Sequence, residues 1–253
     1  MSKKKQPWWQ GMQCAYCPNT ASSEDHIPPR CLYQNKGKGL PLVVVPSCET
    51  CRHKFTKDDE FFKTLLVQAA GDTNSVSKDH LLGSVGRAMK RLVIGLGPKL
   101  SRQTVSFDLL TESGIYTGDQ MRAIEISDED WRRIQVILIR IARGLNYRFS
   151  KWKEHYDDHL YNVIDFESED GRKIFNNKNI MEPLQKAKTI ALGDEQVCKA
   201  KVVRYETVKN AHLWSFEFFG RKRFFVLALP RQYAEGIVRR RGDKFMSPSG
   251  ILH

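Results

Sequence analysis

The sequence contains no apolar run long enough to cross a membrane, since a spanning helix needs about 20 consecutive apolar residues. The basic start Met1-Ser-Lys-Lys-Lys5 is not followed by the hydrophobic core of a signal peptide. Cysteine is scarce, and four of the six cysteines lie in two Cys-x-x-Cys pairs, which indicates metal binding in a reducing compartment rather than disulfides. We therefore expect a cytoplasmic protein that does not bind membranes.

Acidic residues are fewer than basic ones, since the chain has 29 Asp and Glu against 41 Lys and Arg. Its formal net charge is +12 and its pI is about 9.4. Such a surface attracts polyanions, so we expect nucleic acid as the partner, duplex DNA first, although a basic protein without a polyanionic partner has the same composition. Residues 221–244 hold eight of the basic side chains and two acidic ones. Within this segment we expect phosphate contacts from Arg221, Lys222, Arg223, Arg239, Arg240 and Arg241.

The two cysteine pairs are Cys14-Ala-Tyr-Cys17 and Cys48-Glu-Thr-Cys51, with 30 residues between them. Each pair suits two adjacent corners of a tetrahedral site, and together they supply four thiolates. Four protein ligands leave no open coordination position, which predicts a structural zinc site. Any chemistry must then come from residues that this site holds in place.

Two histidines lie close to these pairs in sequence. Asp25-His26 lies between the pairs, and Arg52-His53 follows the second pair directly. A carboxylate suits a hard divalent ion, and a histidine near its ordinary pKa can act as a general base. These residue types are typical of metal-assisted phosphodiester hydrolysis.

At these positions the sequence resembles the HNH endonucleases, also called ββα-metal or His-Me finger nucleases, in the variant braced by two Cys-x-x-Cys pairs. The resemblance covers about residues 10–70. Its matching residues are both cysteine pairs, the run Glu24-Asp-His-Ile-Pro-Pro29, the lead-in Val45-Pro-Ser-Cys48, and Lys54-Phe-Thr-Lys-Asp-Asp-Glu-Phe-Phe62.

The resemblance implies an activity and its residues. His26 would be the general base that deprotonates the attacking water, and Asp25 would hold a catalytic Mg²⁺ or Mn²⁺ ion. The expected function is divalent-metal-dependent hydrolysis of DNA phosphodiester bonds, leaving 5′-phosphate and 3′-hydroxyl ends. The alternative is a zinc-containing nucleic-acid-binding protein with a degenerate, non-cutting HNH module, and a third reading is a scaffold for protein interactions.

The sequence departs from the family pattern at two places. The family has Asn or His directly after the last cysteine, where this chain has Arg52, which cannot ligate a cation. Either His53 is the second ligand of the catalytic ion, or Asp25 holds it with water and substrate. Arg52, and Lys54 after it, would then contact phosphate. The middle Asn of the family triplet is also missing, because its place falls in the apolar run 42–45.

The expected fold class is α+β. We predict a zinc-braced ββα-metal, treble-clef-like module over residues 1–70, and a basic α+β domain with a terminal β-hairpin over residues 71–253, for DNA binding or interaction. The expected elements follow from periodicity and turn residues. They are strands near His26 and at 42–45, a helix from about Thr56, a helix at 81–92, strands or loop at 105–126, a helix from Ser127 to Gly144, surface loop with short elements at 151–179, and hairpin strands at 213–219 and 223–229.

Overall fold

A computed structural model describes residues 7–71, 74–80, 82–83, 104–110, 116–124, 126–151, 158–205, 207–241 and 245–247. The side chains of Lys36 and of residues 104–124 and 238–241 lie outside this description. The chain mixes helices with antiparallel sheets, so the expected α+β class is confirmed. Among the described residues, none of the helices combines the length and the apolar character of a membrane span.

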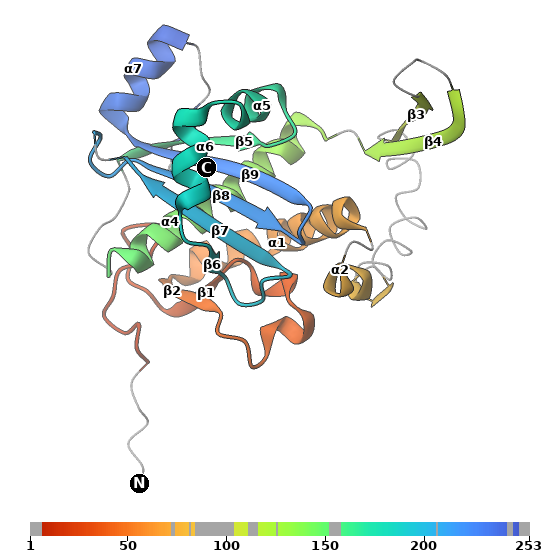
Figure 1. Cartoon of the computed structure of the whole chain (residues 1–253). Helices are drawn as coiled ribbons and strands as arrows, with labels where there is room; N and C mark the ends of the chain where they lie inside the picture. Colours follow the sequence, from red (N-terminus) through yellow and green to blue (C-terminus); the bar gives the residue numbers. More distant parts are fainter. Residues whose placement is uncertain are drawn as a thin grey trace.

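A five-stranded antiparallel sheet with the order β5-β9-β8-β7-β6 forms the centre of the molecule (Figure 1). Two further antiparallel pairs, β1-β2 and β3-β4, complete the strands. The strands are β1 Ser23–Ile27, β2 Val43–Ser47, β3 Thr104–Leu110, β4 Tyr116–Ile124, β5 His159–Asp165, β6 Ile190–Ala191, β7 Cys198–Arg204, β8 His212–Phe218 and β9 Lys222–Pro230.

Helices lie on both faces of the five-stranded sheet, with α1 and α4 on one face and α5 and α6 on the other (Figure 1). We call the face with α1 and α4 the inner face and the face with α5 and α6 the outer face. The helices are α1 Glu49–Ala70, α2 Ser75–His80, α4 Asp128–Phe149, α5 Glu169–Phe175, α6 Lys178–Lys186 and α7 Arg231–Arg241, with short 3-10 turns η1 Arg30–Leu32 and η2 Gln34–Gly37.

Aromatic side chains connect the inner face to its helices. The Phe62 ring of α1 lies 5.3 Å from the Phe218 ring, and the Trp131 ring of α4 lies 6.4 Å from the Phe224 ring. The Trp214 indole donates a hydrogen bond of 3.0 Å to the side-chain oxygen of Asn146. One core cluster contains residues from both sides of position 70, including the four paired cysteines and the inner face of the sheet. The proposed division at residue 70 stays a prediction.

Several expected elements are confirmed. The hairpin β1-β2 precedes α1, and β8 and β9 form the expected terminal hairpin. Ser127 caps α4, because its hydroxyl accepts a 3.1 Å hydrogen bond from the backbone N–H of Asp130. The ambiguous segment 105–126 contains the antiparallel pair β3-β4. The expected helix at 81–92 lies outside the described residues except for 82–83.

Two helix boundaries and the surface position of one segment were wrong. The helix expected from Thr56 begins at Glu49 with Cys48 as its N-cap, and the Thr56 hydroxyl donates to the carbonyl of Arg52 inside the helix. The helix expected to end at Gly144 continues to Phe149. The segment 151–179, expected as surface loop with short elements, contains the short strand β5, which is largely buried because it pairs with β9, a partner distant in sequence. The last two errors arise because tertiary contacts override local signals.

Gly144 allows β1 to approach α4 closely. A Cβ atom at this position would lie 2.0 Å from Cδ1 of Ile27, a residue that is 1% exposed. The glycine therefore serves helix packing rather than helix termination.

We expect Gly144→Ala to lower the free energy of unfolding by about 1–3 kcal/mol, because the added methyl group overpacks a buried contact. Urea unfolding measures this change. Ile27→Val removes the Cδ1 atom, so Gly144→Ala should destabilise the Ile27→Val variant less than the wild type. An equal effect in both backgrounds would contradict the proposed contact.

Candidate metal centre

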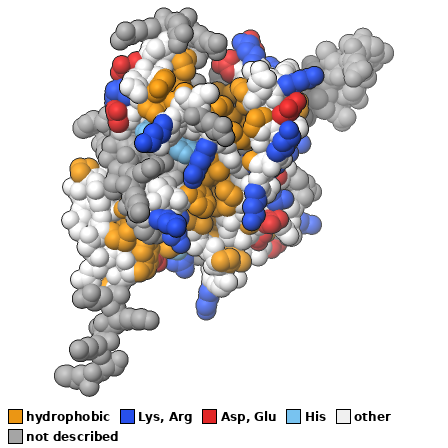
Figure 2. Space-filling view, turned by 60° about the vertical axis from the view of Figure 1, so that its left-hand side comes forward, with side chains coloured by type: hydrophobic (Ala, Val, Ile, Leu, Met, Phe, Trp, Pro, Cys, Tyr) orange, Lys and Arg blue, Asp and Glu red, His pale blue; other side chains and the backbone are white. Residues whose placement is uncertain are grey.

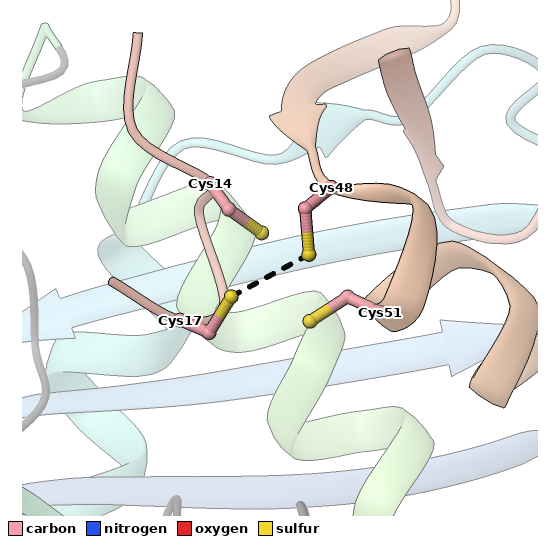
Figure 3. A group of neighbouring side chains, drawn as sticks. All are labelled: Cys14, Cys17, Cys48 and Cys51. Carbon is pink, nitrogen blue, oxygen red and sulfur yellow. Dashed lines mark hydrogen bonds between the residues drawn. The ribbon is translucent and has the colours of Figure 1, made fainter. Parts of the chain in front are cut away.

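Four cysteines converge where the loop before β1 meets the start of α1 (Figure 3). The sulfur atoms of Cys14, Cys17, Cys48 and Cys51 all lie within 4.8 Å of one another, and those of Cys17 and Cys48 are 3.5 Å apart. Sulfur atoms at about 2.3 Å from a tetrahedral zinc ion are about 3.8 Å apart. All four residues are buried. The cluster can therefore hold a metal ion such as zinc.

Backbone hydrogen bonds hold the first pair against the second. The N–H of Cys14 donates to the carbonyl of Asn19 at 2.8 Å, which closes the loop that carries the first pair. The N–H of Ala15 donates to the carbonyl of Pro46 at 2.9 Å, two residues before Cys48. The loop and the start of α1 are thus joined by the main chain as well as by the sulfur atoms.

The pKa values of Cys14, Cys17 and Cys51 depend on one another. A hydrogen bond from Cys51 lowers the pKa of Cys14 to about 5, and the same bond raises the pKa of Cys51 strongly. Burial raises the pKa of Cys17 to about 11. Of these three thiols, Cys14 therefore loses its proton most easily. Four thiolates in this space require a cation, which is consistent with a metal site.

The other two cysteines do not belong to the cluster. The Cys31 thiol donates to the carbonyl of Asp59 at 3.4 Å, and burial raises its pKa to about 12. Cys198 is fully buried at the start of β7, and burial raises its pKa well above the ordinary value. Both are ordinary protonated thiols, as expected.

Asp25 extends from β1 towards α4. Its Oδ2 accepts a 2.8 Å hydrogen bond from the Tyr16 hydroxyl and lies 3.8 Å from Nε of Arg140. Its Oδ1 accepts a 3.0 Å hydrogen bond from the backbone N–H of His26. Burial raises the pKa of Tyr16 well above its ordinary value, so the phenol remains a donor. The sequence did not identify Tyr16 or Arg140 as partners of this carboxylate.

Arg140 lies between two carboxylates in the interior. Its side chain is 1% exposed, its Nη2 lies 2.5 Å from Oδ1 of Asp59, and its guanidinium carbon lies 4.5 Å from the centre of the Phe55 ring. Within the described residues, its Nη1 has no hydrogen-bond partner. Burial raises the pKa of Asp59 to about 6, against the opposing effect of the nearby guanidinium. We call Tyr16, Asp25, Asp59 and Arg140 the buried polar cluster.

His26 is half-buried on β1, opposite Val44 of β2. Burial lowers its pKa below 6.5, and the positive charges of Arg30 and, to a smaller extent, Arg52 act in the same direction. The imidazole is therefore neutral at pH 7. Arg30 is exposed near this histidine, and the sequence did not single it out.

The residues that follow the second cysteine pair lie exposed on the first turns of α1. Nε2 of His53 lies 3.4 Å from Oε1 of Glu49, and its side chain is 75% exposed. Arg52 and Lys54 are exposed beside it. In the described part of the chain, the four cysteines are the one group of three or more His, Cys, Asp or Glu residues placed to share an ion. The role of His53 stays a prediction.

The basic residues near the C-terminus have different surroundings. Lys222 pairs with Asp165 at 2.9 Å and also with Glu167, and Arg223 pairs with Glu217 at 2.7 Å. Arg221 is exposed in the turn between β8 and β9. The side chains of Arg239, Arg240 and Arg241 on α7 lie outside the described residues. Their contacts with nucleic acid stay predictions.

No family model, curated protein or solved structure matches the chain.

We expect the purified protein to contain one zinc ion per chain, measured by elemental analysis. Cys48→Ser should abolish this content and lower the unfolding temperature, because a buried four-sulfur site loses the ligand at the N-cap of α1. Cys31→Ser is the matched control and should keep the metal. Equal metal content in both variants would contradict the assignment.

We expect Asp59 to make stability depend on pH. Because its pKa is raised from 3.8 to about 6, the folded chain holds this proton more tightly than the unfolded chain. The wild type should lose about 2–3 kcal/mol of stability relative to Asp59→Asn between pH 4 and pH 7, and nothing more above that. Urea unfolding at several pH values measures the difference, with Asp58→Asn as the neighbouring control. A constant difference would refute the assignment.

Proposed function

We propose that the chain is a divalent-metal-dependent endonuclease of the HNH type, with the four-cysteine centre as its zinc-binding scaffold. One observation carries the proposal. The hairpin β1-β2 and α1 follow one another directly around the cysteine cluster, with His26 on β1. This order of strand, strand and helix is the one that the resemblance of residues 10–70 implies.

His26 is the proposed general base. A base must be unprotonated before it can accept a proton from water, and the lowered pKa of His26 keeps its ring neutral at physiological pH. The guanidinium groups of Arg30 and Arg52 are close enough to depress this pKa, and both side chains are exposed. Guanidinium groups bind phosphate oxygens, so a phosphodiester drawn to them would lie near the imidazole.

Asp25 is the proposed holder of a Mg²⁺ or Mn²⁺ ion, together with His53, water and the substrate phosphate. When bound, such an ion polarises the phosphoryl oxygen and stabilises the leaving oxygen. Sites for Mg²⁺ commonly use one or two carboxylates and several waters. A carboxylate has about four acceptor positions, and the hydrogen bonds to Tyr16 and His26 occupy two of them.

Positive charge supports DNA as the substrate. The chain carries a formal net charge of +12. On the face seen in Figure 2, Lys and Arg side chains are spread around a central group of hydrophobic side chains, while Asp and Glu lie mainly towards the margins. Phosphate neutralisation by such side chains supplies sequence-independent affinity that weakens with salt.

A second candidate is a nucleic-acid-binding protein that does not cut. The observation that favours it is the Arg140 guanidinium, which lies 3.8 Å from the Asp25 carboxylate and is almost completely buried. This fixed positive charge partly satisfies Asp25 and repels a divalent cation from the same oxygens. In this alternative Asp25 neutralises the buried Arg140 charge and takes no part in catalysis.

We expect the wild type to nick supercoiled plasmid with Mg²⁺ or Mn²⁺, and His26→Ala to lose at least about 100-fold in rate, as general bases contribute. The rate should rise with pH as His26 loses its proton and should be constant above about pH 7.5, one unit above the ordinary histidine pKa, because burial lowers the pKa of His26 below that ordinary value. Gel electrophoresis of the plasmid measures both effects.

Zinc content and thermal unfolding of His26→Ala verify that the variant folds. Equal inactivity of both proteins, with DNA binding that weakens with salt, would select the non-cutting alternative. No measurable affinity for nucleic acid would exclude both and leave the scaffold reading.

A further inference from the structure

The outer face of the five-stranded sheet contains a hollow of about 390 Å³ beneath α5 and α6. It lies on the opposite face from α1, α4 and the cysteine centre (Figure 1). Pockets for small ligands have volumes of about 300–1,000 Å³. Arg223, one of the expected phosphate contacts, lines this hollow, but none of Asp25, His26 and His53 does, so its function is a separate question.

The strand register arranges the floor of the hollow in two rows. One row crosses the sheet through Lys199, Glu217 and Arg223. The next row crosses it through Lys201, Ser215 and Phe225. All six side chains line the hollow. The floor is thus charged along one row and mixed along the other.

A small residue in the middle of the floor creates the space. Ser215 has large or long side chains on both sides in its row, Lys201 and Phe225. Leu184 of α6 is buried against the same face. Phe166 and Phe175 form an aromatic wall, with ring centres 5.2 Å apart, and Phe175 is 49% exposed. One side of the hollow is therefore aromatic and open to a ligand.

The lining of the hollow carries an excess of positive charge. It holds three cationic side chains and one carboxylate, which leaves about two positive charges. The Arg223 guanidinium pairs with Glu217 at 2.7 Å and lies 5.5 Å from the centre of the Phe166 ring, and Nζ of Lys201 donates to the carbonyl of Gln185 at 3.1 Å. Within the described residues, the ammonium group of Lys199 and the hydroxyl of Ser215 have no polar partner. Both groups are available to an anion.

We propose that this hollow binds a nucleoside monophosphate unit. The base packs against Phe166 and Phe175, and the phosphate binds the ammonium groups of Lys199 and Lys201 and the hydroxyl of Ser215. A phosphomonoester carries about −1.5 to −2 charges at pH 7, which matches the excess in the hollow. Bases of any sequence stack on aromatic rings. The proposal does not require that the chain cleaves DNA.

Isothermal titration calorimetry with AMP, adenosine and inorganic phosphate tests the proposal. AMP should bind the wild type, and adenosine and phosphate should each bind at least tenfold more weakly, because each has only half of the contacts. The double variant Lys199→Met, Lys201→Met should lose at least tenfold in AMP affinity. Its matched control is Lys186→Met, Lys188→Met, which removes two exposed lysines that do not line the hollow.

Ser215→Trp fills the centre of the floor and should abolish AMP binding while the unfolding temperature verifies its fold. The lysine variants keep the test valid if that protein does not fold. No heat with AMP, or equal affinity in both lysine variants, overturns the proposal.

A 5′-phosphorylated single-stranded oligonucleotide tests whether the nucleoside monophosphate unit comes from a free nucleotide or from the end of a nucleic acid strand. Binding at least tenfold tighter than AMP, with the same loss in Lys199→Met, Lys201→Met, identifies the end of a nucleic acid strand as the ligand. Equal or weaker binding than AMP identifies a free nucleotide.

Discussion

The buried guanidinium of Arg140 is the constraint on which the arrangement of the N-terminal segment depends. An ion removed from water is unfavourable by several kcal/mol unless hydrogen bonds and opposite charge compensate it. Asp25 on β1 and Asp59 on α1 supply that compensation from two elements, and α4 carries the arginine. These three elements can therefore be packed together in few ways. The same contacts fix the carboxylate of Asp25, which precedes His26 in the chain, so packing and the proposed chemistry depend on one charge.

The cysteine centre and the buried polar cluster stabilise different contacts of this segment. The hairpin β1-β2 is short and cannot be stable alone, because two-stranded hairpins are marginal in water. Four sulfur atoms connect the loop before the hairpin to the helix after it, and the polar cluster then connects both to α4. The five-stranded sheet adds the apolar surface that Phe62 and Trp131 cover.

The sequence predicted the parts of the fold that depend on local patterns. The matched cysteine pairs predicted the cluster, Ser127 predicted the start of α4, and alternating aromatic residues predicted the β8-β9 hairpin. Arg140 could not be predicted, because it lies in the apolar pattern of a long helix and its partner Asp59 is 81 residues away. The strands β5 and β7 have polar or mixed sequences whose pairing depends on β9 and β8. The hollow on the outer face follows from that register, which no local signal encodes.

Tyr16 lies between the cysteines of the first pair and gives the molecule a further property. Its ring is 5.6 Å from that of Phe55, and its hydroxyl holds Asp25. The Tyr16 side chain therefore helps to order both the loop that carries Cys14 and Cys17 and the carboxylate of Asp25. If binding of a metal ion to the cysteines orders Tyr16 and with it Asp25, thermodynamic reciprocity requires that a ligand of Asp25 raises the affinity for that ion by the same factor. The cysteine centre and the Asp25 carboxylate are thus connected through one side chain.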